Sequence, residues 1–458
     1  MTRGRHFVVL LALLRPTSGG AQERPRAGAA RADSVIQVGA DREVKIDAAK
    51  LATVEPYLAA DPRDSNHLLV GVSLVAKLGD PRRPDFAQDV TCAALASFDA
   101  GQSWLRHDFP TKKCGDPWVT ILPNGRAVFL ALGRELLAYR SLDGGRTWSD
   151  SAVSFGRGHD HGTLAVDQTG GRFGGSVYVA SHQSTNDDAG KVRDAVFIAR
   201  SSDGGATFTE PTRIIPSYLP TFPDNPVTLA DGSLIVPFAN FTRRTADKER
   251  LDLLWSIIST DGGSTFSPPR YVADCAGGWG ELAVDASPGP LRDRLYWVCW
   301  DRSNRHVYLY SSADRGETWS DPVVVNRSPG PVQKPPGPVQ TAAIAVNRDE
   351  VVGISWYDAR NDHREYRGTF RCQEVFFAAS LDGGRTFRPD VKVSTAENCP
   401  DTPANGEAGR RFVAGGDYHG LAAAADGRFH LVWADSREGI YQLRTAVVRV
   451  AAKATDAR

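Results

Sequence analysis

Three arginines follow a tryptophan at short spacings near the ends of apolar segments. They lie in the runs Trp300–Arg302 (WDR), Trp356–Arg360 (WYDAR) and Trp433–Arg437 (WADSR). A guanidinium group is planar and can hold a carboxylate through two parallel hydrogen bonds, so Arg302, Arg360 and Arg437 are candidates for binding an acidic sugar. The same spacing is also typical of a salt bridge between Asp and Arg beside a stacked aromatic ring. The sequence leaves both interpretations open.

Carboxylic acids that precede apolar segments form a second set of candidates. They are Glu55, Asp116, Asp160 and Glu281. Glycoside hydrolysis needs one group that protonates the leaving oxygen and another that attacks the sugar or activates water, and carboxyl pairs commonly supply both. We therefore predict catalytic acid or base roles for Asp116, Asp160 and Glu281. Glu55 is a further candidate acid, for which we predict contact with substrate. Each of the four could instead cap backbone amides in a loop.

Histidines recur beside these acids. His159 and His161 flank Asp160, and His419 lies far along the chain next to a tyrosine. Two histidines one residue apart on a strand face the same side and could share a metal ion, with His182 and His419 as further ligands. A hydrogen-bonded structural pair is the favoured alternative, so we expect no metal and no other cofactor. We predict instead that His159, His161 and His419 contact substrate.

A repeated octapeptide organises the chain that carries these residues. The pattern Ser-x-Asp-x-Gly-x-Thr-aromatic, with one Ser in place of Thr, follows strand-like apolar runs six times. Its aspartates are Asp99, Asp143, Asp203, Asp261, Asp314 and Asp382. Asp can accept hydrogen bonds from nearby backbone amides, Gly tolerates positive φ, and the terminal aromatic ring can pack back on the sheet. Each copy is therefore predicted to be a hairpin turn with a structural aspartate.

A second repeat precedes each octapeptide: a short apolar strand, a turn and a stronger apolar strand. The stronger strands begin at His67, Arg126, Ser176, Ser233, Arg294, Val351 and Phe429. The seventh copy has no octapeptide and ends in a single further strand. Residues 34–46 can supply its missing outer strand and close a ring, which removes exposed sheet edges. We predict an all-β propeller over residues 34–450, with seven blades favoured and six possible.

Propeller geometry assigns the candidates to one face, because successive antiparallel strands reverse direction. If the octapeptides join the third and fourth strands on one face, the residues before each first strand and after each second strand lie on the other. Those positions hold the acids, histidines and arginines named above. A tyrosine joins them as Asp417-Tyr418-His419. Ligand sites favour the mouths of closed β-structures, so we expect chemistry opposite the octapeptides.

The octapeptides are similar to the Asp boxes of the sialidase superfamily and its BNR-repeat relatives. The resemblance spans nearly all of the predicted propeller and implies a secreted protein that processes glycans, as a glycoside hydrolase acting on an acidic sugar. Sialidases use a tyrosine nucleophile assisted by a glutamate, and Tyr418 is the best match here. Their Arg-Ile-Pro element before the first box has its nearest counterpart far downstream, at Arg213–Pro216. A non-catalytic propeller that binds glycan or protein is therefore the alternative, and a polysaccharide lyase is a third.

Composition limits the partners and the compartment. Lys plus Arg and Asp plus Glu both number 54, so no net charge attracts nucleic acid or an anionic membrane. Basic residues near the N-terminus and the apolar run from Phe7 to Leu14 predict an export signal over residues 1–21. Residues 22–33 and 451–458 are predicted to be disordered. We expect an extracytoplasmic monomer, secreted or periplasmic, that binds a glycan or glycoconjugate and has no membrane-spanning segment.

The cysteines support the same compartment. They fall into three pairs that are local in sequence, without the spacing of a metal knuckle: Cys92 and Cys114, Cys275 and Cys299, and Cys372 and Cys399. An even number of cysteines in an exported chain favours structural disulfides, and pairing in sequence order is the simplest of fifteen arrangements.

Overall fold

The computed structural model divides the chain into two units, Met1–Ser34 and Val35–Arg458, and describes residues of the second unit. The described residues run from 35 to 451 without 47–50, 78–88, 187–189, 218, 242–251, 276–279, 302–305, 327–339, 363–371, 401, 403, 406–407, 409–410 and 413. The predicted export signal and the predicted disordered segment after it lie outside this range, as do residues 452–458 of the predicted tail.

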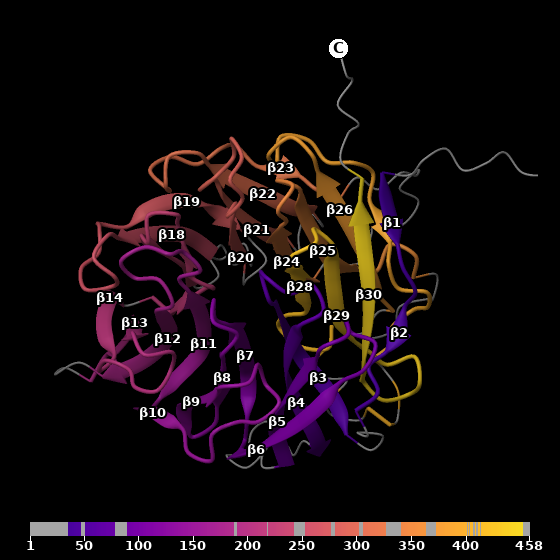
Figure 1. The fold of residues 1–458 in the computed structure, drawn as a ribbon, viewed down its shortest axis with the longest axis horizontal. Coiled ribbons are helices and arrows are strands. Elements are labelled where there is room, and N and C mark those ends of the chain that lie inside the picture. The colour runs from indigo at the N-terminus through magenta and orange to yellow at the C-terminus, as the bar shows by residue number, and fades with distance from the viewer. Residues whose placement is uncertain are drawn as a thin grey trace, which may run out of the picture. The chain divides into compact units, whose positions relative to one another are not determined.

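Seven antiparallel sheets of four or five strands surround a common axis, as Figure 1 shows. Blade 1 consists of β3 (Ala52–Ala60), β4 (Leu68–Lys77), β5 (Asp89–Ser97) and β6 (Leu105–Lys112). Blade 2 consists of β7 (Gly115–Ile121), β8 (Ala127–Leu132), β9 (Glu135–Ser141) and β10 (Val153–Arg157). Blade 3 consists of β11 (His159–Val166), β12 (Val177–Asn186), β13 (Val192–Ser201) and β14 (Thr212–Ser217). The fold is therefore the predicted all-β propeller with seven blades.

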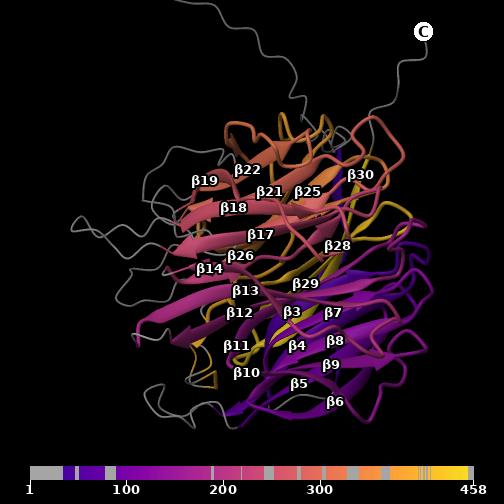
Figure 2. The ribbon, with the colours of Figure 1, turned by 90° about the vertical axis from the view of Figure 1, so that its left-hand side faces the viewer.

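The remaining blades follow in chain order, and Figure 2 shows β17 to β19 of blade 4 side by side. Blade 4 consists of β15 (Thr221–Pro223), β16 (Val227–Thr228), β17 (Leu234–Phe241), β18 (Asp252–Ser259) and β19 (Arg270–Cys275). Blade 5 consists of β20 (Glu281–Val284), β21 (Leu295–Asp301), β22 (His306–Ser312) and β23 (Val323–Val324). Blade 6 consists of β24 (Gln340–Val346), β25 (Val352–Asp358), β26 (Glu374–Ser380) and β27 (Val391–Lys392). Blade 7 combines β28 (Gly420–Ala423), β29 (Phe429–Asp435) and β30 (Gln442–Val450) with β1 (Ile36–Val38) and β2 (Arg42–Glu43).

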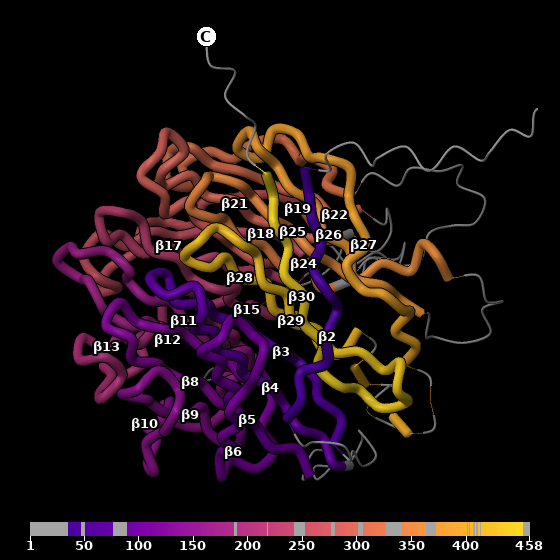
Figure 3. Tube along the Cα trace, turned by 45° about the vertical axis from the view of Figure 1, so that its right-hand side comes forward, coloured from indigo at the N-terminus to yellow at the C-terminus, as the bar shows by residue number. Residues whose placement is uncertain are grey.

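The N-terminal strands close the ring in the predicted way. β1 pairs antiparallel with β30, with Ile36 opposite Val450, and β2 pairs with the same strand further along. Figure 3 shows the indigo β2 beside the yellow β30. Inner strands contact one another around the axis, and β28 contacts β3. The first and last described strands therefore share one sheet.

The hydrophobic core is divided into layers between neighbouring blades. β25, β26 and β29 are buried along their whole length, because each blade is covered on both faces. One layer between blades 6 and 7 packs Tyr357 and Phe377 against Phe429 and Trp433. Strands covered on both faces are expected to be apolar without alternation, which is what the seven stronger strands show in the sequence. Among the described residues, no helix is both long and apolar enough to cross a membrane.

Three disulfides pair the cysteines in sequence order, as expected. Cys92 bonds to Cys114, Cys275 to Cys299 and Cys372 to Cys399. The first joins β5 of blade 1 to the segment that enters blade 2. The second joins β19 of blade 4 to β21 of blade 5. Two of the three bonds therefore cross-link neighbouring blades.

The Asp boxes form the predicted turns. In the box at Ser201, Asp203 Oδ1 accepts the Thr207 amide at 2.9 Å, and the Thr207 hydroxyl donates to Oδ2 at 2.6 Å. Ser201 donates to Oδ1 at 2.8 Å. Burial alone would raise the pKa of Asp203, but the hydrogen bonds from Thr207 and Ser201 outweigh it and lower the pKa to about 2. The ionised carboxylate is thus the form that holds the turn.

Replacing Asp203 with alanine is expected to lower the free energy of unfolding by about 1 kcal/mol at pH 7, because the four hydrogen bonds that this exposed carboxylate accepts are lost. The folded pKa lies below the unfolded value, so this stabilisation is present above about pH 4 and is lost as the pH falls toward 2. Urea unfolding of wild type and variant at pH 7 and pH 3 checks both points. Asp150→Ala, at an exposed carboxylate outside the boxes, should change neither value measurably.

Candidate active site

Four inner strands carry a β-bulge at the same face of the ring, opposite the Asp boxes. Each bulge places a non-glycine residue at positive φ: Glu55 (56°), Asp116 (44°), His161 (47°) and Thr341 (44°). Positive φ in such residues is uncommon, and bulges of this kind often re-aim a side chain next to an active site. The bulges therefore set an acid, a second acid and an imidazole at equivalent places on blades 1 to 3.

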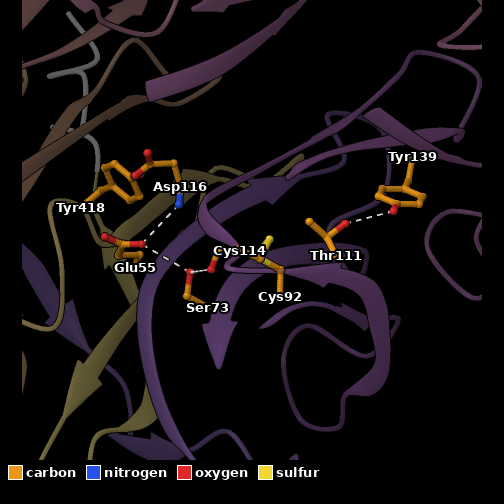
Figure 4. The surroundings of a disulfide bond; sticks show 8 residues. All are labelled: Glu55, Ser73, Cys92, Thr111, Cys114, Asp116, Tyr139 and Tyr418. Atoms are coloured by element: carbon orange, nitrogen blue, oxygen red, sulfur yellow. Dashed lines mark hydrogen bonds between the residues drawn. A yellow bond between two sulfur atoms is a disulfide. The ribbon is translucent and has the colours of Figure 1, made fainter. Parts of the chain in front are cut away.

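Three blades contribute to one hydrogen-bonded cluster, shown in Figure 4. The Tyr418 hydroxyl, just before β28, donates a short hydrogen bond to Asp116 Oδ1 on β7. The Asp116 amide donates to Glu55 Oε2 at 3.3 Å, and the Ser73 hydroxyl lies 3.3 Å from the same oxygen. Tyr418 and Glu55 are buried. The structure thus brings together three of the residues that the sequence singled out.

Burial dominates the electrostatics of this cluster. It raises the pKa of Asp116 to about 7, with a further contribution from the charge of Asp160 and an opposing one from the Tyr418 hydrogen bond. The pKa of Glu55 is raised well above its ordinary value by burial and then by the charge of Asp116. Burial also raises the pKa of Tyr418. At neutral pH, Asp116 is therefore poised between its acid and its base form.

Two charged side chains lie at the exposed edge of the cluster. Asp160 is exposed, accepts the His161 amide at 3.0 Å, and lies close enough to raise the pKa of Asp116. Arg411 is exposed, and its positive charge lowers the pKa values of both Glu55 and Asp116. It has no ion-pair partner within the described part of the chain. Sequence reasoning missed Arg411, because it lies outside both repeats, between β27 and β28.

A small cavity continues from the cluster along the axis. It has a volume of about 20 Å³ and takes its walls from blades 2 to 7. The lining includes Trp118, His161, Asp224, Glu281, Tyr418 and His419. Burial raises the pKa of Glu281 to about 8 and lowers those of His161 and His419 to about 4 and 3. Both imidazoles are therefore neutral at physiological pH, and a sugar ring must bind outside this cavity.

The arginines of the tryptophan motifs lie elsewhere. Arg360 binds Asp358 at 2.6 Å and Asp390 at 2.9 Å, and its guanidinium stacks on Phe376. Arg437 binds Asp435 and Asp41 at 2.7 and 3.0 Å. Neither lines the axial cavity. This geometry matches the salt-bridge interpretation of the motif, so a role for them in binding substrate stays a prediction. Arg302 lies outside the described residues.

The remaining histidines make hydrogen bonds instead of a compact ligand set. His159 uses both ring nitrogens, to Ser181 Oγ at 2.9 Å and to the Phe155 carbonyl at 3.0 Å. His182 pairs with Asp194 at 3.0 Å. Among the described residues, the one group of three with ligand atoms close enough for a metal is Cys372, Glu397 and Cys399, where a disulfide occupies both sulfurs. Roles for His159, His161 and His419 in binding substrate stay predictions.

Several known proteins are similar to this chain. A xyloglucanase from a Paenibacillus species is 26% identical over 282 residues, which cover 57% of this chain and 26% of that protein. A solved protein of unknown function from Dyadobacter fermentans has a TM-score of 0.50 at 12% identity, covering 91% of this chain and 99% of that one. A Hadza microbial sialidase has a TM-score of 0.48 at 13% identity, covering 90% and 91%.

The family assignment comes from the sequence. The model of the BNR repeat-like domain matches residues 172–431, which is more than half of the chain and includes four of the six Asp boxes. With seven closed blades and the box turns in place, the chain belongs to the family of BNR repeat-like domain proteins.

Proposed function

We propose that this propeller is a retaining glycoside hydrolase with Tyr418 as nucleophile and Asp116 as the base that activates it. The observation that carries the proposal is the partly buried hydrogen bond from Tyr418 Oη to Asp116 Oδ1, beside two further candidate acids. A phenol of raised pKa attacks poorly unless a neighbouring group takes its proton. Asp116 is positioned for this transfer, and its pKa of about 7 suits a base at neutral pH.

The proposed reaction has two steps. First, Tyr418 Oη bonds to the anomeric carbon, its proton passes to Asp116, and Asp160 gives a proton to the departing glycosidic oxygen. Second, Asp160 takes a proton from water, the water oxygen displaces Tyr418 from the sugar, and Asp116 returns the proton to the phenol oxygen. Two displacements retain the configuration of the anomeric carbon. Glu281 lies deeper, in the axial cavity, and has no proton transfer in this scheme.

The substrate we propose carries an acidic group near the scissile bond. Arg411 supports this choice, because it is an exposed guanidinium beside the cluster with no carboxylate partner in the described structure. An anionic sugar bound there would supply that partner. We also propose that the protein works outside the cytoplasm, where its three disulfides are stable.

A panel of glycans tests the activity. We expect release of reducing sugar from a sialylated or uronic-acid-containing glycan, and a covalent adduct on the Tyr418 peptide after reaction with a fluorosugar inactivator. The panel should include xyloglucan, since one relative is named a xyloglucanase. Turnover of xyloglucan alone would contradict the acidic substrate. Glycan binding without any turnover would contradict hydrolysis and favour the non-catalytic alternative.

The pH dependence follows from Asp116, which must be ionised to accept the proton. We expect kcat/KM to rise as Asp116 ionises, with the midpoint of the rise near pH 7. Arg411→Met removes a positive charge that lowers the pKa of Asp116, so the midpoint of this rise should move to higher pH. Profiles between pH 4 and pH 9 measure it. Arg63→Met, on the Asp-box face, should leave the midpoint in place; an unmoved midpoint in Arg411→Met would contradict the assignment.

A further inference from the structure

Asp224 carries a buried carboxyl group that the proposed reaction does not use. The residue is 1% exposed, and neither carboxyl oxygen has a hydrogen-bond partner among the described residues. The Gly280 amide and the Trp297 indole lie near enough to lower its pKa, but neither meets the geometry of a hydrogen bond, and burial keeps the pKa well above its ordinary value. An isolated buried carboxylate is costly, so this group needs a proton or a positive charge beside it.

A second carboxyl group faces the same cavity. Glu281, at the start of β20, accepts the Ile344 amide through Oε2 at 2.9 Å, and its Oε1 accepts no hydrogen bond from the described residues. Asp224 and Glu281 both line the axial cavity, and they come from the neighbouring blades 4 and 5. No Lys or Arg is among the described residues that line the cavity, and its two imidazoles are neutral. The cavity of about 20 Å³ has room for one water-sized occupant.

We propose that this axial cavity binds one hard divalent cation, Ca²⁺ or Mg²⁺, through the carboxylates of Asp224 and Glu281. Carboxylate oxygens are the ligands that both ions prefer, and a bound cation would offset the charge that burial otherwise penalises. The two ligands come from blades 4 and 5, so the ion would cross-link neighbouring blades at the axis. This inference concerns a structural site and does not rest on the proposed hydrolysis.

Metal content and thermal unfolding test the site. The full-length protein is dialysed against EDTA and re-equilibrated with CaCl₂, MgCl₂ or NaCl at matched ionic strength. We expect one divalent ion per chain by equilibrium dialysis, and an unfolding midpoint several degrees higher with CaCl₂ or MgCl₂ than with NaCl. Asp224→Asn should bind no ion and show no such rise. In NaCl it should be at least as stable as wild type, because asparagine is nearly isosteric with aspartic acid and needs no proton to be neutral.

The matched control is Asp285→Asn. Asp285 is also fully buried and has one unpartnered oxygen, but it does not line the cavity, so this variant should respond to divalent ions as wild type does. Wild type that binds no ion and gains no stability would overturn the proposal and leave the carboxyl groups protonated. A full response in Asp224→Asn would overturn it as well. If Asp224→Asn does not fold, Glu281→Gln is measured in the same way. Neither measurement uses catalysis, so a negative result would overturn the cation site without contradicting the proposed hydrolysis.

Discussion

Replacing Tyr418 with phenylalanine should reduce kcat for glycan hydrolysis by a factor of ~10³ or more, with little change in KM. The variant keeps the ring that packs against Trp118 and His161 and loses only the hydroxyl that donates to Asp116. The loss therefore falls on the reacting atom and not on the fold. Steady-state kinetics on the glycan that the wild type cleaves best give both constants.

The control removes a hydroxyl from another buried tyrosine. Tyr296→Phe deletes a fully buried hydroxyl without a hydrogen-bond partner, in a blade core away from the axial cavity. It should retain wild-type kinetics and equal or higher stability, because no hydrogen bond is lost. If Tyr418→Phe retained more than a tenth of wild-type turnover, Tyr418 would not be the nucleophile. A similar loss in Tyr296→Phe would point to general damage to the propeller.

Asp41→Ala should cost about 3 kcal/mol of unfolding free energy, the largest loss that we expect from a single surface-loop change. Asp41 lies between β1 and β2, and its side chain is fully buried. It binds Arg437 at 3.0 Å, forms a short ion pair with Arg444 on β30, and accepts the Thr395 amide at 2.8 Å. Removing it leaves two largely buried guanidinium groups without this partner and loosens the N-terminal strands.

Guanidinium chloride unfolding at pH 7 measures this effect. Asp426→Ala breaks the more exposed pair with Arg428 and should cost less than about 1 kcal/mol. Burial by itself raises the pKa of Asp41, but the hydrogen bonds from Arg444 and Thr395 outweigh it and leave the pKa lowered. The stabilisation should therefore be present at neutral pH and shrink as the pH falls below about 4. Equal denaturation midpoints for Asp41→Ala and Asp426→Ala would show that Asp41 does not hold the closure.

Local patterns in the sequence were enough to predict the architecture. Each Asp box satisfies its own carboxylate within five residues, so its eight letters predict the turn, and the seventh repeat without a box predicted closure by residues 34–46. The residues of the site also followed from position, because Glu55 and Asp116 lie in the first halves of inner strands and Tyr418 lies just before one. Topology alone therefore brought them together.

Contacts between distant segments could not be predicted from the sequence. The spacing in the tryptophan motifs shows that Arg360 and Arg437 lie near an Asp, but their second partners, Asp390 and Asp41, come from other segments. The bulges that turn Glu55 and Asp116 to positive φ depend on strand register, which residue types do not encode. Arg411 could not be predicted as a site residue, because it belongs to no repeat.

Ring closure also constrains how the chain can fold. The pairing of Ile36 with Val450 joins residues at opposite ends of the described chain, so the last sheet cannot assemble until the chain has been synthesised as far as β30. Bringing such distant segments together carries a large loop-closure entropy and slows folding. Until then β30 presents an unpaired edge that another chain could occupy. Refolding should therefore end in a slow phase, and exchange of the N-terminal strands between copies is the misfolding route that this topology favours.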